Sequence, residues 1–142
     1  MPSQSDCVFC KIVAGTIPST RVFENDSTLA FLDIGPLAEG HLLVIPRDHY
    51  ERIADVPSEL FGAVASQAPM LGRALLEVTG AEGFNLLVNQ GRAAGQVVPH
   101  VHFHLIPRKT DDGLGYRWNA GSYPAGRDAE IATALKHAVT KR

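Results

Sequence analysis

Residues 100–106 read His-Val-His-Phe-His-Leu-Ile, and this alternation decides the expected fold and chemistry. Successive side chains of a β-strand point to opposite faces of the sheet. The sequence therefore predicts one short strand with His100, His102 and His104 on one face. On its other face lie Val101, Phe103 and Leu105, which suit burial in a core. Imidazole titrates near neutral pH, so histidine serves as nucleophile, general acid or base, or metal ligand.

Two simpler explanations of the three histidines are a purification tag and a face that only binds metal. A tag is a run of adjacent histidines at a chain end, whereas these alternate with apolar residues inside the chain. Histidines two apart on a strand can bind one ion together. Catalysis is the favoured interpretation, and metal binding without catalysis stays an alternative.

The N-terminal half predicts short elements separated by turn residues. A helix over 8–14 ends at Gly15, and Asn25-Asp26-Ser27 joins strands over 20–24 and 28–34 into a hairpin. An apolar strand over 41–46 follows. Ser58 is then a candidate N-cap for one long helix that ends near Gly80, with a kink at Pro69.

The C-terminal half supplies two more strands, over 84–89 and over the histidines. Residues 109–124 look irregular, and Ile131, Leu135 and Ala138 predict a short amphipathic C-terminal helix. Hairpin-paired strands with one inserted helix predict an α+β fold on an antiparallel sheet, with residues 1–142 as a single domain.

The composition is ordinary for a globular protein: 142 residues, 45% apolar and 20% charged. The net charge is −2 with scattered Lys and Arg, which argues against duplex nucleic acid and membrane as partners. Because no secretory signal and no membrane-spanning apolar run occur in the sequence, we expect a cytoplasmic protein. Cys7 and Cys10 are the only cysteines, and their spacing favours a metal clip or redox motif over a structural disulfide.

Taken together, these motifs resemble the histidine triad (HIT) superfamily of nucleotidyl hydrolases and transferases. Besides the histidine motif preceded by Gly95-Gln96, the matching segments are Cys7–Ile17, Phe31–Ile34, Gly40–Pro46, Asn89 and Gly95–Pro107. The resemblance implies a HIT-like fold, with about five antiparallel strands, one long helix and short terminal helices. It also implies a homodimer.

The resemblance assigns chemistry to the middle histidine. His102 would attack the α-phosphorus of a nucleotide and form a covalent nucleotidyl-imidazole that water then hydrolyses. His104 would contact the phosphate, and His41 would orient the site. The loop Gly95-Gln96-Val97-Val98 would aim N–H groups and the Gln96 amide at the developing charge. Val97 departs from the serine or threonine that relatives often carry, so it puts the leaving-group preference in doubt.

The nucleoside end also follows from the resemblance. Asp33 would accept hydrogen bonds from the ribose hydroxyls, and Asn89 would steady the sugar and phosphate. An apolar pocket would hold a purine base; the residues implied are Phe9, Ile12, Ile17, Phe31 and Ile34.

The same resemblance implies a structural zinc ion. Its ligands would be Cys7, Cys10, His49 and His100, a Cys₂His₂ set suited to tetrahedral zinc. His100 would then be ligand and scaffold for the triad rather than the reacting group. The alternative is two free thiols and a surface His49.

The expected activity is hydrolysis at the α-phosphate of a purine nucleoside phosphoramidate or related adenylate, as in the Hint branch. A first alternative is a dinucleoside polyphosphate hydrolase or phosphorylase, as in the Fhit branch, with cations from Arg92, Arg108, Lys109 and Arg117. A second alternative is a nucleotide-binding interaction module whose hydrolysis is incidental.

Overall fold

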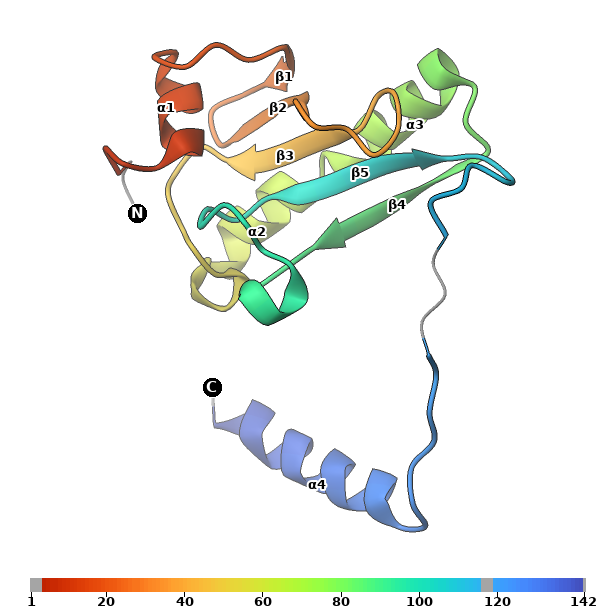
Figure 1. The fold of residues 1–142 in the computed structure, drawn as a ribbon. Helices are drawn as coiled ribbons and strands as arrows, with labels where there is room; N and C mark the ends of the chain where they lie inside the picture. The colour runs from red at the N-terminus through yellow and green to blue at the C-terminus, as the bar shows by residue number, and fades with distance from the viewer. Residues whose placement is uncertain (1–3, 116–118, 142) are drawn as a thin grey trace.

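One antiparallel sheet organises the protein (Figure 1). The computed structural model describes residues 4–115 and 119–141. The strands lie in the order β1-β2-β3-β5-β4, and their bounds are β1 (Arg21–Glu24), β2 (Thr28–Leu32), β3 (Leu42–Pro46), β4 (Gly83–Val88) and β5 (Phe103–Arg108). The helices are α1 (Val8–Ala14), α2 (Ser58–Ala65), α3 (Ala68–Thr79) and α4 (Arg127–Thr140), with short 3₁₀ turns η1 (Ile53–Asp55) and η2 (Arg92–Ala94). The α+β class with five antiparallel strands is confirmed.

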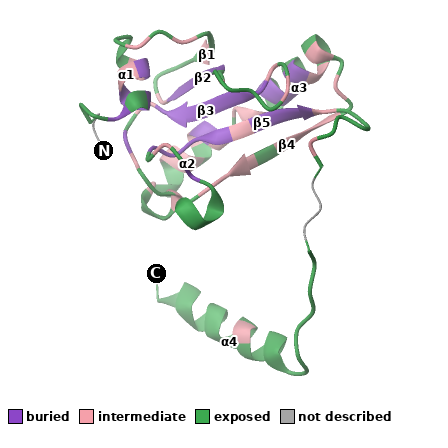
Figure 2. Ribbon diagram, viewed as in Figure 1, coloured by how far each residue is buried: buried purple, intermediate pink, exposed green. Residues whose placement is uncertain are grey.

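Both faces of the sheet are covered. Successive side chains of β2 and β3 point to opposite faces and so join two different hydrophobic clusters. Leu43 and Ile45 of β3 pack in a cluster with Phe9 and Ile12 of α1. Leu42 and Val44 pack in a second cluster with residues of α2 and α3. Every residue of β3 is therefore buried, and the purple strands in the middle of Figure 2 mark this core.

The long helix expected from Ser58 to Gly80 is two helices, so that prediction was wrong. Helix α2 ends at Ala65, and α3 begins at Ala68 with Pro69 in its first turn. Proline lacks the N–H that would bond to the carbonyl of residue 65, and its ring clashes there. The first helix therefore ends before Pro69, and a second helix begins, instead of one helix kinking at the proline. The Ser58 cap was also wrong, because the N-cap is Pro57 and makes no side-chain bond.

The expected histidine strand also starts later than its alternation suggested. The pairing of β5 with both β3 and β4 ends at Phe103, so only His104 lies in the strand. Before it, the Val101 N–H donates to the carbonyl of Tyr50 at 2.7 Å instead of to a strand neighbour. His100 and His102 thus sit on a segment that leaves the sheet and can turn toward α1.

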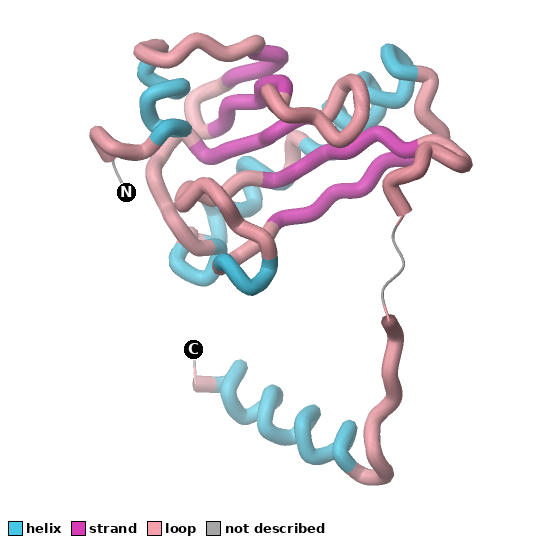
Figure 3. The backbone as a smooth tube through the Cα atoms, viewed as in Figure 1, coloured by secondary structure: helices cyan, strands magenta, loops and turns pink. Residues whose placement is uncertain are grey.

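The C-terminal region lies apart from the sheet. Beyond β5 the described residues up to 115 and from 119 to 126 form no regular element, and α4 then stands clear of the other helices (Figure 3). Among residues 4–115 and 119–141, no helix combines the length and apolar character that crossing a membrane requires.

Candidate active site and metal centre

His102 is held in one tautomer by the backbone. Its Nδ1 lies 2.7 Å from the carbonyl oxygen of His100, and a carbonyl only accepts, so Nδ1 carries the proton. The lone pair is then on Nε2. The Phe9 ring packs edge-on against the imidazole with centroids 5.1 Å apart. Burial lowers the pKa of His102, which favours the neutral ring that a nucleophile needs.

A second hydrogen-bond chain fixes the proton of His104. The Leu37 N–H donates to Nδ1 of His41 at 3.1 Å, so the proton of neutral His41 is on Nε2. That Nε2 lies 2.9 Å from Nδ1 of His104 and donates to it. His104 therefore presents an N–H from its own Nε2, the donor that a phosphate oxygen requires. Its pKa is lowered to about 4, first by burial and then by repulsion from His102 and His41.

Asp33 lies beside this chain. One carboxylate oxygen is 3.7 Å from Nε2 of His41, and the other accepts from the Gly35 N–H at 2.8 Å. Asp33, His41 and His104 also meet the distance requirement for a metal site. Two of the candidate ligand nitrogens are already joined in the His41–His104 hydrogen bond, however. The arrangement therefore suits a polar anchor next to the phosphate position better than an ion.

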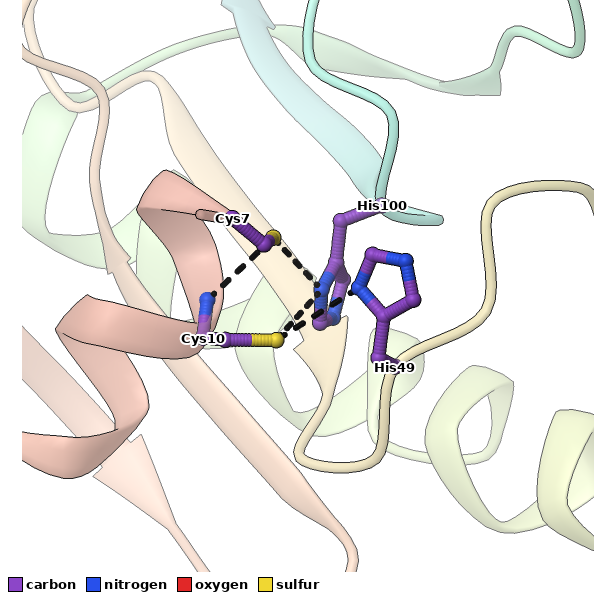
Figure 4. Close-up of side chains that lie close together, drawn as sticks. All are labelled: Cys7, Cys10, His49 and His100. Carbon is purple, nitrogen blue, oxygen red and sulfur yellow. Dashed lines mark hydrogen bonds between the residues drawn. The ribbon is translucent and has the colours of Figure 1, made fainter. Parts of the chain in front are cut away.

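The four expected metal ligands converge in one buried cluster (Figure 4). Cys7 and Cys10 come from the start of α1, His49 from the loop after β3 and His100 from the segment before β5. Nδ1 of His100 is 3.4 Å from the Cys7 sulfur and 3.6 Å from the Cys10 sulfur. Nδ1 of His49 is 3.4 Å from the Cys10 sulfur.

These separations fit zinc. Tetrahedral zinc, with Zn–S near 2.3 Å and Zn–N near 2.0–2.1 Å, places a sulfur and a nitrogen about 3.5 Å apart. His100 donates from Nε2 to the carbonyl of Pro46 at 2.9 Å, which leaves Nδ1 as the lone-pair nitrogen that faces the sulfurs. Burial also lowers the pKa of His100 to about 4, so the ring is a neutral ligand. Backbone N–H groups of Cys10 and Gln4 point at the Cys7 and Cys10 sulfurs, respectively, each at 3.4 Å.

The loop before the histidines approaches Asn89. Asn89 directly follows Val88, which pairs with Phe103 at the start of β5, and a Cβ added to Gly95 would lie 3.6 Å from the Asn89 amide nitrogen. The loop therefore lies next to the residue that follows β4.

The expectation that the Gln96 amide faces the phosphate is corrected by its contacts. Its oxygen accepts from the Gly91 N–H at 2.8 Å. Its nitrogen donates to the carbonyls of Glu51 and Val98 at 2.8 and 3.1 Å. The Gln96 amide is thus fully used in bracing the loop. The backbone N–H groups of Gly95 and Gln96 also donate within the loop, to the carbonyls of Arg92 and Gly91. Val97 is 88% exposed and borders a 420 Å³ cavity with Glu51 and Arg92.

The apolar residues expected around the base separate into two groups. Phe9, Ile12 and Phe31 are buried in one cluster, with Ile17 packed partly buried against it. Ile34 does not join them, since its side chain is fully exposed after the end of β2. Of the expected phosphate cations, Arg108 is engaged with Asp112 and Asn85, and Arg117 lies outside the described residues.

Sequence reasoning missed the partners that orient the histidines. The carbonyls of His100 and Pro46 and the N–H of Leu37 are backbone groups, which no residue-type pattern encodes. The one part of this network that the sequence analysis indicated is His41, which the resemblance implied would orient the site.

Comparison with known proteins fits this geometry. The HIT domain matches residues 14–111. The chain belongs to the HIT domain family. The fold is accordingly the HIT-like fold, as expected.

Three named members of the HIT family are informative relatives. "Adenosine 5'-monophosphoramidase HNT1" of Candida albicans is 38% identical over 99% of this chain and 96% of its own length. "Adenylylsulfatase HINT3" of Arabidopsis thaliana is 47% identical over 78% of this chain and 56% of its own length. "Protein hit" of Bacillus subtilis is 43% identical over 83% of this chain and 82% of its own length.

Solved HIT structures match closely as well. SMU.412c from Streptococcus mutans superposes with a TM-score of 0.92 at 37% identity, covering 96% of this chain and 87% of that one. A HIT family protein from Bacillus anthracis gives 0.89 at 37% identity, covering 96% and 99%. A Zn-bound histidine triad family protein from Mycobacterium smegmatis gives 0.74 at 37% identity, covering 94% and 97%.

Proposed function

We propose that the protein is a nucleotide-binding hydrolase that cleaves at the α-phosphate of a purine nucleoside phosphoramidate or related adenylate. The observation that carries the proposal is the fixed tautomer of His102, with a protonated Nδ1 and a lone pair on Nε2. The names of the Candida and Arabidopsis relatives support this substrate class.

In the first step Nε2 of His102 forms a bond to the α-phosphorus while the bond to the leaving group breaks. The leaving group departs with the electron pair and, if it is an amine, takes up a proton. In the second step water attacks phosphorus, the P–N bond to His102 breaks, and a nucleoside monophosphate is released. The N–H on Nε2 of His104 and the backbone N–H of Val97 would be donors for the phosphate oxygens in both steps. The N–H groups of Gly95 and Gln96 already donate to the carbonyls of Arg92 and Gly91 within the loop.

The nucleoside would be held by Asp33 and by the apolar cluster that packs against the histidines. A residue that binds ribose must be accessible to it. The Asp33 side chain is 20% exposed, and one of its oxygens lies next to His41. The buried cluster of Phe9, Ile12 and Phe31 would supply the apolar wall against which a base packs.

We further propose that Cys7, Cys10, His49 and His100 bind a structural zinc ion. The sulfur–nitrogen distances fit, and the Mycobacterium smegmatis relative is named as Zn-bound. An ion here would tie α1 to the loop after β3 and to the segment before β5, and would contribute to folding stability. Buried unpaired thiols also agree with a cytoplasmic protein.

The decisive experiment compares adenosine phosphoramidate, adenylyl sulfate and diadenosine polyphosphates as substrates. It uses the wild type, His102→Asn and the control His137→Asn, whose histidine is exposed on α4. Turnover lost only in His102→Asn, with an acid-labile phosphohistidine trapped in the wild type, supports the proposal. Preference for the diadenosine polyphosphates would keep the His102 mechanism but assign the protein to the alternative function, a dinucleoside polyphosphate hydrolase. Absence of turnover with intact nucleotide binding would favour the interaction module.

A further inference from the structure

A cavity of 420 Å³ lies between two loops and carries two charged side chains. The loop after β3 contributes Glu51, and the loop between β4 and β5 contributes Arg92 and Val97. The two loops lie side by side in Figure 1, and Nε2 of Gln96 joins them by donating to the carbonyl of Glu51 at 2.8 Å. The two walls of the cavity are therefore tied to each other.

Hydrogen bonds on both sides hold the backbone of Arg92, the first residue of η2. Before it, the Gly91 N–H donates to the side-chain oxygen of Gln96 at 2.8 Å. After it, the Gly95 N–H donates to the carbonyl of Arg92 at 2.9 Å. The same Gln96 side chain thus holds the backbone of Arg92 on one wall and that of Glu51 on the other. The fold therefore sets the span between the two charged residues.

The two charges do not neutralise each other. Both side chains are exposed, and within the described part of the chain neither Glu51 nor Arg92 forms a salt bridge. Glu51 has a cation beside it, since the pKa of Arg52 is raised first by its bond to Asp55 and to a smaller extent by the charge of Glu51. Residues 85–99 contain no charged residue other than Arg92. The positive wall is therefore the less compensated one and fits an anion.

Val97 places this cavity next to the phosphate position of the proposed reaction. Its side chain is 88% exposed and lines the cavity, and its backbone N–H would donate to the phosphate. The described residues that line the cavity are Glu51 and members of 91–99. The nucleoside would lie elsewhere, against Phe9 and beside Asp33. With the phosphate at Val97, the part of the substrate left to enter the cavity is the leaving group.

We propose that the cavity receives the leaving group and that Arg92 selects leaving groups that carry a negative charge. A guanidinium offers its N–H donors in a planar fork that matches carboxylates and other oxyanions. Glu51 repels the same anion from the opposite wall and so favours its placement at Arg92. The inference rests on the proposed function, and it adds a specificity-determining residue and the chemical class of the leaving group.

The first test measures binding without turnover, in the His102→Asn background. The ligands are the adenosine 5'-phosphoramidates of glycine and of glycinamide, which differ by one negative charge on the leaving amine. By calorimetry, Arg92→Gln should weaken the glycine compound about fivefold relative to the glycinamide compound, the effect of an ion pair between exposed groups. The matched control Arg73→Gln removes the same charge from an exposed position on α3 and should leave this ratio unchanged.

The outcomes of this test separate the inference from the proposed function. If both compounds bind but Arg92→Gln leaves their ratio at the wild-type value, the leaving-group inference alone fails. Equal losses on both compounds would assign Arg92 to the phosphate and would also overturn it. If neither compound binds to any variant, the proposed function fails as well.

Glu51 provides a test of opposite sign. Glu51→Gln keeps the carbonyl that Gln96 binds and removes only the negative charge of the side chain. Because the repulsion is lost, the ratio should move about twofold in favour of the glycine compound. A ratio that falls or stays unchanged would contradict an anion bound between these two walls.

A third ligand, adenylyl sulfate, distinguishes two sources of the negative charge. Its charge lies on the group bound directly to the phosphate, whereas the carboxylate of the glycine compound lies further along the leaving group. The ligand that loses more affinity in Arg92→Gln, relative to the glycinamide compound, identifies the source. A loss on neither ligand would overturn the proposal.

Discussion

Nε2 of His41 lies 2.9 Å from Nδ1 of His104, and the proton between them belongs to His41. A backbone N–H therefore determines, through two imidazoles, which nitrogen of His104 faces the site as a donor. His41 is a positioning residue, because it reaches the reacting atoms only through His104.

Replacing His41 tests this chain directly. His41→Ala leaves the Leu37 N–H and Nδ1 of His104 without partners and should lower the free energy of unfolding by about 1–3 kcal/mol. His41→Gln keeps an oxygen for Leu37 and a donor for His104, so it should recover part of the loss. Urea unfolding measures the stabilities, and ¹⁵N NMR reports the His104 tautomer. An unchanged tautomer in His41→Ala would contradict the assignment.

The lowered pKa of His104 predicts that the folded protein becomes less stable in acid. The folded protein binds this proton only near pH 4, whereas the unfolded chain binds it near pH 6.5. The share of stability linked to His104 is therefore complete above about pH 6.5 and is lost as the pH falls toward 4. Denaturant unfolding across this range should show a shallower decline for His104→Gln than for wild type. The exposed-site control His137→Gln should follow the wild-type curve; an unchanged decline in His104→Gln would rule out this linkage.

Replacing the proposed zinc ligands tests how much the ion contributes to folding stability. Cys7→Ser and Cys10→Ser are expected to lose bound zinc and to melt at a lower temperature, because the ion's binding free energy adds to folding. Elemental analysis and thermal unfolding with and without a chelator measure both effects. A wild-type protein that contains no metal and is insensitive to the chelator would refute the site.

Val97 offers a test of leaving-group preference. A leaving amine must be protonated, and valine has no hydroxyl to donate to it. Val97→Ser should raise kcat/KM for adenosine phosphoramidate by about fivefold, the effect of one net hydrogen bond near 1 kcal/mol. Adenylyl sulfate should change less, since sulfate leaves without a proton. Because Val97 is 88% exposed, stability should not change. Equal gains on both substrates would argue against the leaving-group explanation.

Gln96 is predicted to brace the loop by donating two hydrogen bonds. Gln96→Glu keeps the acceptor for Gly91 but turns the two donated bonds into repulsion, at a cost of about 1–3 kcal/mol. Gln90→Glu is a matched control, because Gln90 only accepts, from the Ala54 N–H. Hydrogen exchange over residues 91–98 should quicken in the first variant alone. Slow exchange in Gln96→Glu would mean that the amide does not hold the loop.

Much of the fold and site could be predicted because side-chain types and spacing carried the information. The Cys7/Cys10 spacing favoured a metal clip, and the family resemblance implied its two histidine ligands. The turn residues 25–27 located β2, and an apolar run located β3. The errors had local physical causes. Pro69 divides a helix that apolar periodicity made continuous, and a strand pattern over 100–102 belongs to a segment whose backbone bonds to Tyr50. Gln96 was misplaced because its partners are main-chain groups of Gly91, Glu51 and Val98, which no sequence motif reveals.

His100 serves the two centres with different parts of itself. Its imidazole belongs to the metal cluster, whereas its main-chain carbonyl selects the tautomer of His102. A carbonyl is present whatever the side chain, so mutation of residue 100 can abolish the ion without erasing the acceptor. The proposed metal site and the proposed nucleophile are therefore neighbours that selection could retain or discard separately, and a descendant of this chain would have a route to a metal-free site with the same histidine at position 102.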